Sequence, residues 1–273
     1  MPFAEINNIK ICYEIHGEGY PLILVHGYDV KKEVWVAQIG VLSENFKVIT
    51  VDLRSSGKSD RPEEPYTMDT LVEDLKGLMD FLKIDKANLM GQSMGGWIIQ
   101  NFVLKYPECA NKLILIATNH KGAGIHVLKE SLIKEIEIRE KDPVEAFLGH
   151  ARLMFHLKFR KQMEENLSKE FHGIWSPEDL IKESTIDPKS PLDLENLANA
   201  SASHNTLEKL DQIRNPTLLI TGSHDRMSPK IVLDQMHEKL PNSTLKFIDK
   251  SGHKLFLSKA PEVNQIILEF LTD

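Results

Sequence analysis

Three residues of this chain, Ser93, Asp225 and His253, have the types and the order of a nucleophile with acid and base partners. Ser93 is the centre of Gly91-Gln92-Ser93-Met94-Gly95, a G-x-S-x-G pattern between an apolar run and an amphipathic segment. In a strand–turn–helix setting, this pattern holds the serine on a tight turn with its hydroxyl exposed. A bare five-residue match also fits a glycine-rich connection with an incidental serine. The pattern predicts nucleophilic chemistry if a base and an acid lie close in space.

His253 is the candidate base, and Asp225 is the candidate acid that orients it. The histidine would take the Ser93 proton and later give it to the leaving alcohol. The aspartate would accept the second imidazole N–H and fix the tautomer. A structural histidine and a helix-capping or turn aspartate are the alternatives. Asp249 is a rival acid, but it lies four residues before His253 at a strand end, which is an awkward reach.

The elements that must position these residues follow from hydrophobic periodicity. A hairpin turning at 7–8 is expected first, and buried strands are predicted at 21–25, 46–51, 87–90, 113–117, 216–221 and 243–248. Helical periods lie at 68–82, 97–106, 231–240 and the C-terminus. This alternation predicts an α/β fold with a mostly parallel, twisted sheet of about eight strands flanked by helices. Because the carboxyl ends of parallel strands share one edge, Ser93, Asp225 and His253 are expected to meet there.

The strand series stops between 118 and 214, where the sequence is helical or loop-like and richer in charge. We expect a helical cap at 119–212, inserted between core segments 1–118 and 213–273. Plain helical padding on the core is the alternative. The segment also carries large apolar residues that either line a pocket or pack the cap on the core, namely Met154, Phe155, Phe159, Met163 and Trp175.

The order Ser…Asp…His, together with three loops, resembles the α/β-hydrolase superfamily. The loops are His26-Gly27-Tyr28, Asp52 to Asp60, and Ser251-Gly252-His253. Over nearly its whole length the chain resembles capped serine hydrolases such as carboxylesterases, enol-lactonases and cofactor-free haloperoxidases. The resemblance implies an oxyanion hole made by the backbone N–H groups of Tyr28 and Met94. It implies an architectural role for the 52–60 loop, where Ser55 stands in place of a usual glycine.

The predicted function is a serine hydrolase that cleaves a small-molecule carboxylic ester or lactone through an acyl-enzyme, without a cofactor. C–C bond hydrolysis is an alternative, although Lys254 follows His253 where such enzymes usually carry an aromatic residue. Haloperoxidase or perhydrolase activity with the same triad, and a non-enzymatic ligand receptor, are further alternatives. Ser93 at the turn argues against epoxide hydrolases and haloalkane dehalogenases, which carry aspartate there.

The amino-acid composition limits the classes of molecule that the protein is expected to bind. The chain has 33 basic and 40 acidic residues and a net charge of −7, which argues against non-specific binding to nucleic acid or an anionic membrane. The sequence shows no signal-peptide pattern and no run long enough to span a membrane. Its two cysteines, Cys12 and Cys109, suggest no disulfide framework, so a cytoplasmic location is expected. Histidine spacing predicts no metal site. The substrate and the oligomeric state stay open.

Overall fold

Eight strands form one sheet in the computed structural model, which describes residues 1–273. The strands are β1 Phe3–Ile6, β2 Ile9–His16, β3 Tyr20–Val25, β4 Phe46–Val51, β5 Ala87–Gln92, β6 Ala110–Ile116, β7 Thr217–Gly222 and β8 Ser243–Ile248. Their order across the sheet is β1-β2-β4-β3-β5-β6-β7-β8. The pairs β1–β2 and β2–β4 are antiparallel, and all other pairs are parallel. The predicted α/β class and the strand number are confirmed.

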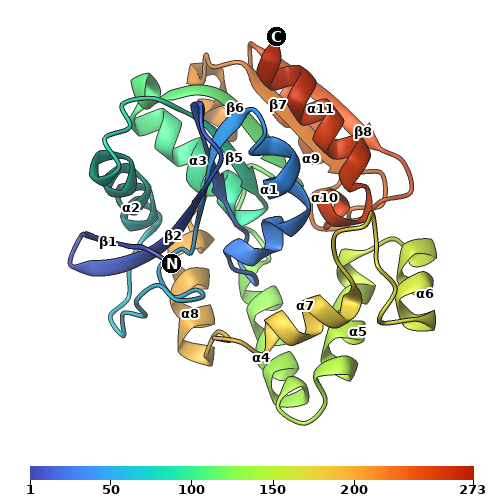
Figure 1. Ribbon diagram of the computed structural model, residues 1–273. Helices are drawn as coiled ribbons and strands as arrows, with labels where there is room; N and C mark the ends of the chain where they lie inside the picture. The colour runs from blue at the N-terminus through green and yellow to red at the C-terminus, as the bar shows by residue number, and fades with distance from the viewer.

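Helices cover both faces of this sheet (Figure 1). Along β3, Ile23 and Val25 share a core with helices α2, α3 and α9, whereas Leu22 and Leu24 share another with α1, α10 and α11. Central strands are therefore apolar on both faces, as a doubly covered parallel sheet requires. The bounds are α1 Val36–Leu42, α2 Met68–Phe81, α3 Met94–Lys105, α9 Lys230–Lys239, α10 Leu255–Ser258 and α11 Ala260–Thr272, with short 3-10 turns at Lys32–Trp35, Pro107–Cys109 and Leu207–Gln212.

Five more helices lie between β6 and β7, gathered at one end of the sheet (Figure 1). They are α4 Ile125–Arg139, α5 Pro143–Met154, α6 Leu157–Glu165, α7 Pro177–Ser184 and α8 Pro191–Ala202. We call them the α4–α8 segment. Hydrogen bonds tie this segment and its loops to the turns that follow strands β3, β4 and β8: Tyr28 Oη to Leu194 O, Lys189 Nζ to Val30 O, Asn196 Nδ2 to Pro62 O, and Lys254 N to Met154 O. The segment therefore lies over the carboxyl edge of the sheet.

Two elements begin three residues earlier than predicted, and the other differences are smaller. Helix α3 begins at Met94, three residues before the predicted start at Trp97. Its first turn contains Gly95 and Gly96, which have no apolar side chains, so periodicity cannot mark it. Strand β6 begins at Ala110 instead of 113.

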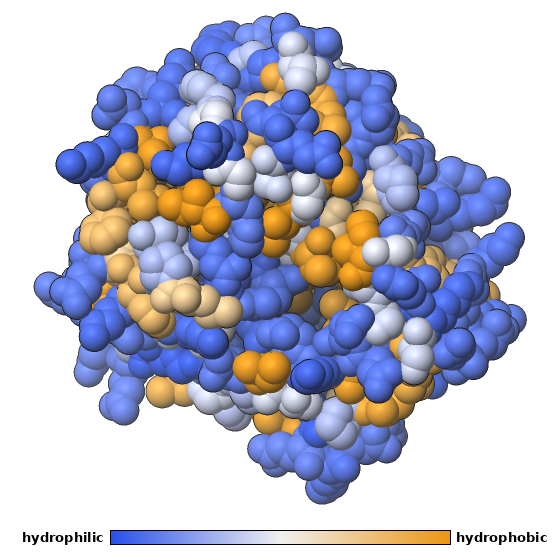
Figure 2. Space-filling view, viewed as in Figure 1, coloured by the Kyte–Doolittle hydropathy of each residue, from blue (hydrophilic) through white to orange (hydrophobic).

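The face seen in Figure 2 is mostly hydrophilic, with separate apolar patches among charged and polar side chains. None of the helices combines the length and apolar character needed to cross a bilayer.

Candidate active site

The backbone at Ser93 is strained in the way a sharp strand-to-helix turn requires. Ser93 has φ 53° and ψ −120°, a region that residues with side chains rarely adopt. The turn is held by Ser93 N–H to Ile116 O at 3.0 Å and by Thr118 Oγ1–H to Ser93 O at 2.7 Å. A Cβ on Gly95 would overlap the Val25 carbonyl oxygen, because the first turn of α3 lies directly against β3. Packing thus imposes the strain.

The Ser93 hydroxyl is free for chemistry. Ser93 precedes α3, yet its side chain caps none of the backbone N–H groups of that helix. It is partly exposed, whereas both neighbours, Gln92 and Met94, are buried. An incidental capping serine would have its oxygen on the helix N–H groups. The Ser93 hydroxyl makes no such bond and lies at the N-terminus of α3, the positive end of the helix dipole.

Asp225 and His253, 28 residues apart, are joined by a hydrogen bond. Nδ1–H of His253 donates to Oδ2 of Asp225 at 2.9 Å, and both residues are buried. This is the one hydrogen bond of the His253 ring, so Nε2 is left as the acceptor nitrogen. No hydrogen bond joins the ring to Ser93 Oγ in this structure. The loop carrying His253 is fixed by Lys254 N–H, which donates to Met154 O at 3.0 Å.

The Asp225 carboxylate is stabilised as an anion. Burial alone would raise its pKa, but the His253 ring and two backbone N–H groups hold the pKa below its usual value. Oδ1 accepts Met227 N–H at 2.9 Å and Ser228 N–H at 3.0 Å. Thr221 Oγ1 lies 3.3 Å from Oδ2. A charged Asp225 can therefore stabilise an imidazolium at His253.

The loop after β3 passes close to the serine turn. A Cβ on Gly27 would lie 3.3 Å from Ser93 Cβ and would overlap the Gln92 side chain. The backbone N–H of Tyr28 donates to no acceptor, and Met94 N–H, at the first position of α3, has no intrahelical partner. Two free backbone donors thus flank the turn of Ser93. Donors of this kind can bind an oxyanion.

This geometry agrees with the family comparison. A sequence model described as "alpha/beta hydrolase fold" matches residues 20–260. The chain belongs to the α/β-hydrolase fold family.

Three similar proteins cover nearly the whole hydrolase. The 2-hydroxy-6-oxononadienedioate/2-hydroxy-6-oxononatrienedioate hydrolase of Paraburkholderia phymatum is 28% identical over 96% of this chain and 91% of its own length. The bromoperoxidase structure from Bacillus anthracis has a TM-score of 0.82 at 27% identity, covering 100% of this chain and 99% of that one. The thermophilic esterase structure from Thermogutta terrifontis has a TM-score of 0.79 at 27% identity, covering 97% and 93%.

His26 has a structural role in this hydrolase. Its Nδ1 lies 2.7 Å from Gly27 O, and its Nε2 accepts Leu53 N–H at 3.1 Å. Complete burial lowers the pKa of His26 to about 3, so the ring is neutral. The His26 ring thus joins two segments: the loop that contains Tyr28 and the residues just after β4. The Tyr28 side chain points away from the serine turn, since Oη donates to Leu194 O at 2.6 Å.

Four other polar residues, two of them named in the sequence analysis, are not part of the serine site. Asp249 is exposed and pairs with Lys250 at 3.1 Å, so it does not compete with Asp225. His224 is also exposed, next to His156. His204 is stacked on Trp97 at 5.2 Å and bonds Asn101. Asp52 is buried and accepts the N–H groups of Lys32 and Lys58, which is an architectural role.

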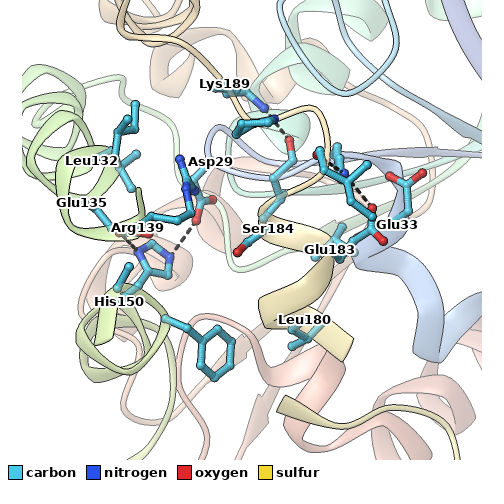
Figure 3. Close-up of a pocket in the computed structure, with 18 of the residues that line it drawn as sticks. Asp29, Glu33, Leu132, Glu135, Arg139, His150, Leu180, Glu183, Ser184 and Lys189 are labelled. Carbon is cyan, nitrogen blue, oxygen red and sulfur yellow. Dashed lines mark hydrogen bonds and ion pairs between the residues drawn. The ribbon is translucent and has the colours of Figure 1, made fainter. Parts of the chain in front are cut away.

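A cavity of about 150 Å³ lies between the sheet edge and the α4–α8 segment (Figure 3). Ser93 and His253 are not among its lining residues, but the next residue of each flanking loop is. Asp29 follows Tyr28, and Lys254 follows His253. Of the large apolar residues noted in the sequence, Phe155 alone lines the cavity, and Met154, Met163 and Trp175 are packed in the core.

The sequence did not reveal the ionic cluster in this cavity. His150 lies between two carboxylates, with Nε2 2.7 Å from Asp29 Oδ2 and Nδ1 2.8 Å from Glu135 Oε2 (Figure 3). Burial alone would lower the pKa of His150, but these carboxylates raise it to about 9. Lys254 and His150 hold the pKa of Asp29 well below its usual range. No sequence signal linked residues 29, 135 and 150, because they come from separate elements.

Proposed function

We propose that this hydrolase cleaves a small-molecule carboxylic ester or lactone through an acyl-enzyme on Ser93. The observation that carries the proposal is the 2.9 Å hydrogen bond from His253 Nδ1 to Asp225 Oδ2, at the sheet edge that also carries the strained Ser93. That bond directs the basic nitrogen, Nε2, away from Asp225 and makes it available to a serine proton. The esterase at 27% identity supports the same class of substrate.

The proposed reaction has two halves. In the first, His253 Nε2 takes the Ser93 hydroxyl proton while Ser93 Oγ forms a bond to the carbonyl carbon. The carbonyl oxygen becomes an oxyanion that accepts the N–H groups of Tyr28 and Met94. The C–O bond to the alcohol then breaks, and the imidazolium gives its proton to the leaving oxygen. In the second half, water attacks the acyl-enzyme with His253 again as base, releasing the acid and restoring Ser93.

We propose that residues 119–212, which contain the α4–α8 segment, form the cap that selects the substrate. Its contacts support this: Leu194 O bonds Tyr28 Oη, and Met154 O bonds Lys254 N–H. One contact is made next to each proposed catalytic loop. Helices α4, α5, α7 and α8 all contribute residues that line the cavity beside the site.

C–C bond hydrolysis is a second candidate, favoured by the relative named as a dienedioate hydrolase at 28% identity. A panel of p-nitrophenyl esters, lactones and 2-hydroxy-6-oxo-dienoates separates the two. We expect Ser93-dependent turnover of the esters and lactones. Turnover restricted to the dienoates would replace the proposed reaction with C–C cleavage.

A further inference from the structure

The carboxylates that face into the cavity beside the proposed active site are already paired. Those of Asp29, Glu135, Glu183 and Glu33 each contact a basic side chain of the protein, and Asp187 is exposed. The pairs are Asp29 with His150 at 2.7 Å and Lys254 at 3.7 Å, Glu135 with His150 at 2.8 Å, Glu183 with Lys31 at 2.6 Å, and Glu33 with Lys32. Apart from the exposed Asp187, each carboxylate of the cavity wall thus already has a basic partner.

Two cationic side chains of the same wall lack a carboxylate partner. Arg139, in the last turn of α4, is partly buried and makes no hydrogen bond or ion pair. Lys189 donates to Val30 O at 2.7 Å and forms no ion pair. Burial lowers the pKa of Lys189 to about 8. Cations withdrawn from water without a counter-ion are unfavourable. Figure 3 shows Arg139 beside the Asp29–His150 pair.

The rest of the wall suits a short hydrocarbon chain. Its apolar residues include Val34, Leu132, Ile136, Phe147, Leu180 and Leu257. Leu194, whose carbonyl accepts Tyr28 Oη, also lines the cavity. The cavity therefore lies directly beside the two loops that carry Tyr28 and His253, because Asp29 and Lys254, the next residues of those loops, line it. The cavity beside the two loops therefore combines apolar side chains with two cations that lack an ion-pair partner.

We propose that Arg139 and Lys189 bind a free carboxylate of the substrate, so that the ester or lactone opened by Ser93 carries a second, anionic carboxylate. This inference rests on the proposed function and specifies its substrate class. A planar guanidinium accepts a carboxylate in a two-pronged contact, and the ammonium supplies a further charged donor. A wholly neutral substrate would leave both cations desolvated and unpaired.

The test compares esters of equal length with and without the charge. Monomethyl succinate, glutarate, adipate and pimelate are compared with methyl butyrate to heptanoate, and O-acetyl ω-hydroxy acids with neutral alkyl acetates. We expect kcat/KM for one or more anionic esters to exceed that of the neutral partner at least tenfold. Neutral esters that match or exceed every anionic partner would overturn the proposal.

Variants assign the effect to the two cations. Arg139→Met removes a side chain that makes no hydrogen bond or ion pair and keeps a long apolar stem, so loss of folding is not expected. The ratio of kcat/KM between anionic and neutral partners should fall about tenfold, mainly through KM, as for loss of one charged hydrogen bond. Lys189→Met should lower the ratio similarly. Lys158→Met, at an exposed lysine of α6, should leave it unchanged. An unchanged ratio in both cavity variants would contradict the assignment.

Binding measured without turnover separates this proposal from the proposed function. Calorimetric titration of Ser93→Ala with succinate to pimelate should give saturable binding that Arg139→Met weakens about tenfold. Dicarboxylate binding with no ester turnover by the wild type would keep the anion site and remove the esterase function. Ester turnover with no dicarboxylate binding would do the reverse. Equal binding of inorganic phosphate would overturn carboxylate selectivity.

Discussion

His150 Nε2 lies 2.7 Å from Asp29 Oδ2, joining helix α5 to the loop that follows β3. Asp29 is the neighbour of Tyr28, and it also lies 3.7 Å from Lys254, the neighbour of His253. Through Asp29, two ion pairs therefore connect the α4–α8 segment to both loops of the proposed active site. The strength of the His150–Asp29 pair depends on pH, because His150 must be charged.

The free energy of unfolding should fall between pH 6.5 and 9.5 through this pair. The pKa of His150 is about 9 in the folded protein, above the unfolded value of about 6.5. The stabilisation is thus complete below about pH 6.5 and is lost as pH rises through about 9. Asp29, with a lowered pKa, stays ionised throughout. We expect a loss of about 1–3 kcal/mol in urea unfolding.

His150→Gln should lack this part of the pH dependence. Lys189, with a pKa of about 8, titrates in the same range with the opposite sign, since burial favours its neutral form. It is present in both proteins, as are Glu135 and Lys254, so the difference between wild type and variant isolates His150. The exposed His126 offers a control, and His126→Gln should follow the wild-type curve. Parallel curves for wild type and His150→Gln would disprove the role.

Ser93→Ala should lower kcat for p-nitrophenyl butyrate at least about 10³-fold, because the proposed nucleophile is removed. The thermal transition should persist, since the Ser93 side chain makes no capping bond. A fluorophosphonate should add its mass to the peptide containing Ser93 in the wild type. Ser131→Ala, at an exposed position of α4, is the matched control. Modification at another serine, or undiminished turnover, would remove Ser93 from the mechanism.

Asp225→Asn should lower kcat about 10³–10⁴-fold, because the amide can no longer hold the required histidine tautomer or stabilise the imidazolium. Asp249→Asn changes the rival acid, whose side chain is exposed, and should leave kcat within about twofold. Steady-state kinetics on one ester decide between them. Similar losses in both variants, or a larger loss at 249, would reassign the acid.

Glycines of two helices should respond to alanine in opposite directions. Gly149→Ala should raise the free energy of unfolding by about 0.5–1 kcal/mol, because Gly149 lies inside α5 with open space at its Cβ. Gly95→Ala should lower it by about 1–3 kcal/mol and impair ester turnover, since the new Cβ overlaps Val25 O. Chemical denaturation of the two variants and the wild type measures both changes in the free energy of unfolding. Stabilisation by Gly95→Ala would show that the turn is looser than described.

Most strands and core helices could be predicted because their signals are local. The apolar runs that became β3, β4 and β7 and the helical period of α2 are visible within a few residues each. The first turn of α3 was missed because glycines carry no periodicity. The α4–α8 helices gave a weak signal, since their apolar residues, such as Phe155 and Trp175, pack on one another as well as on the core.

The sequence by itself determined the α/β class, the serine turn, and the order in which Ser93, Asp225 and His253 follow their strands. These features depend on the types of neighbouring residues and on the rule that parallel strands share one edge. Only the tertiary structure decided that His150 pairs with Asp29 and that Arg139 and Lys189 face the cavity unpaired. Such contacts join elements more than 100 residues apart. They depend on how helices of the α4–α8 segment are seated on the sheet, which no local pattern encodes.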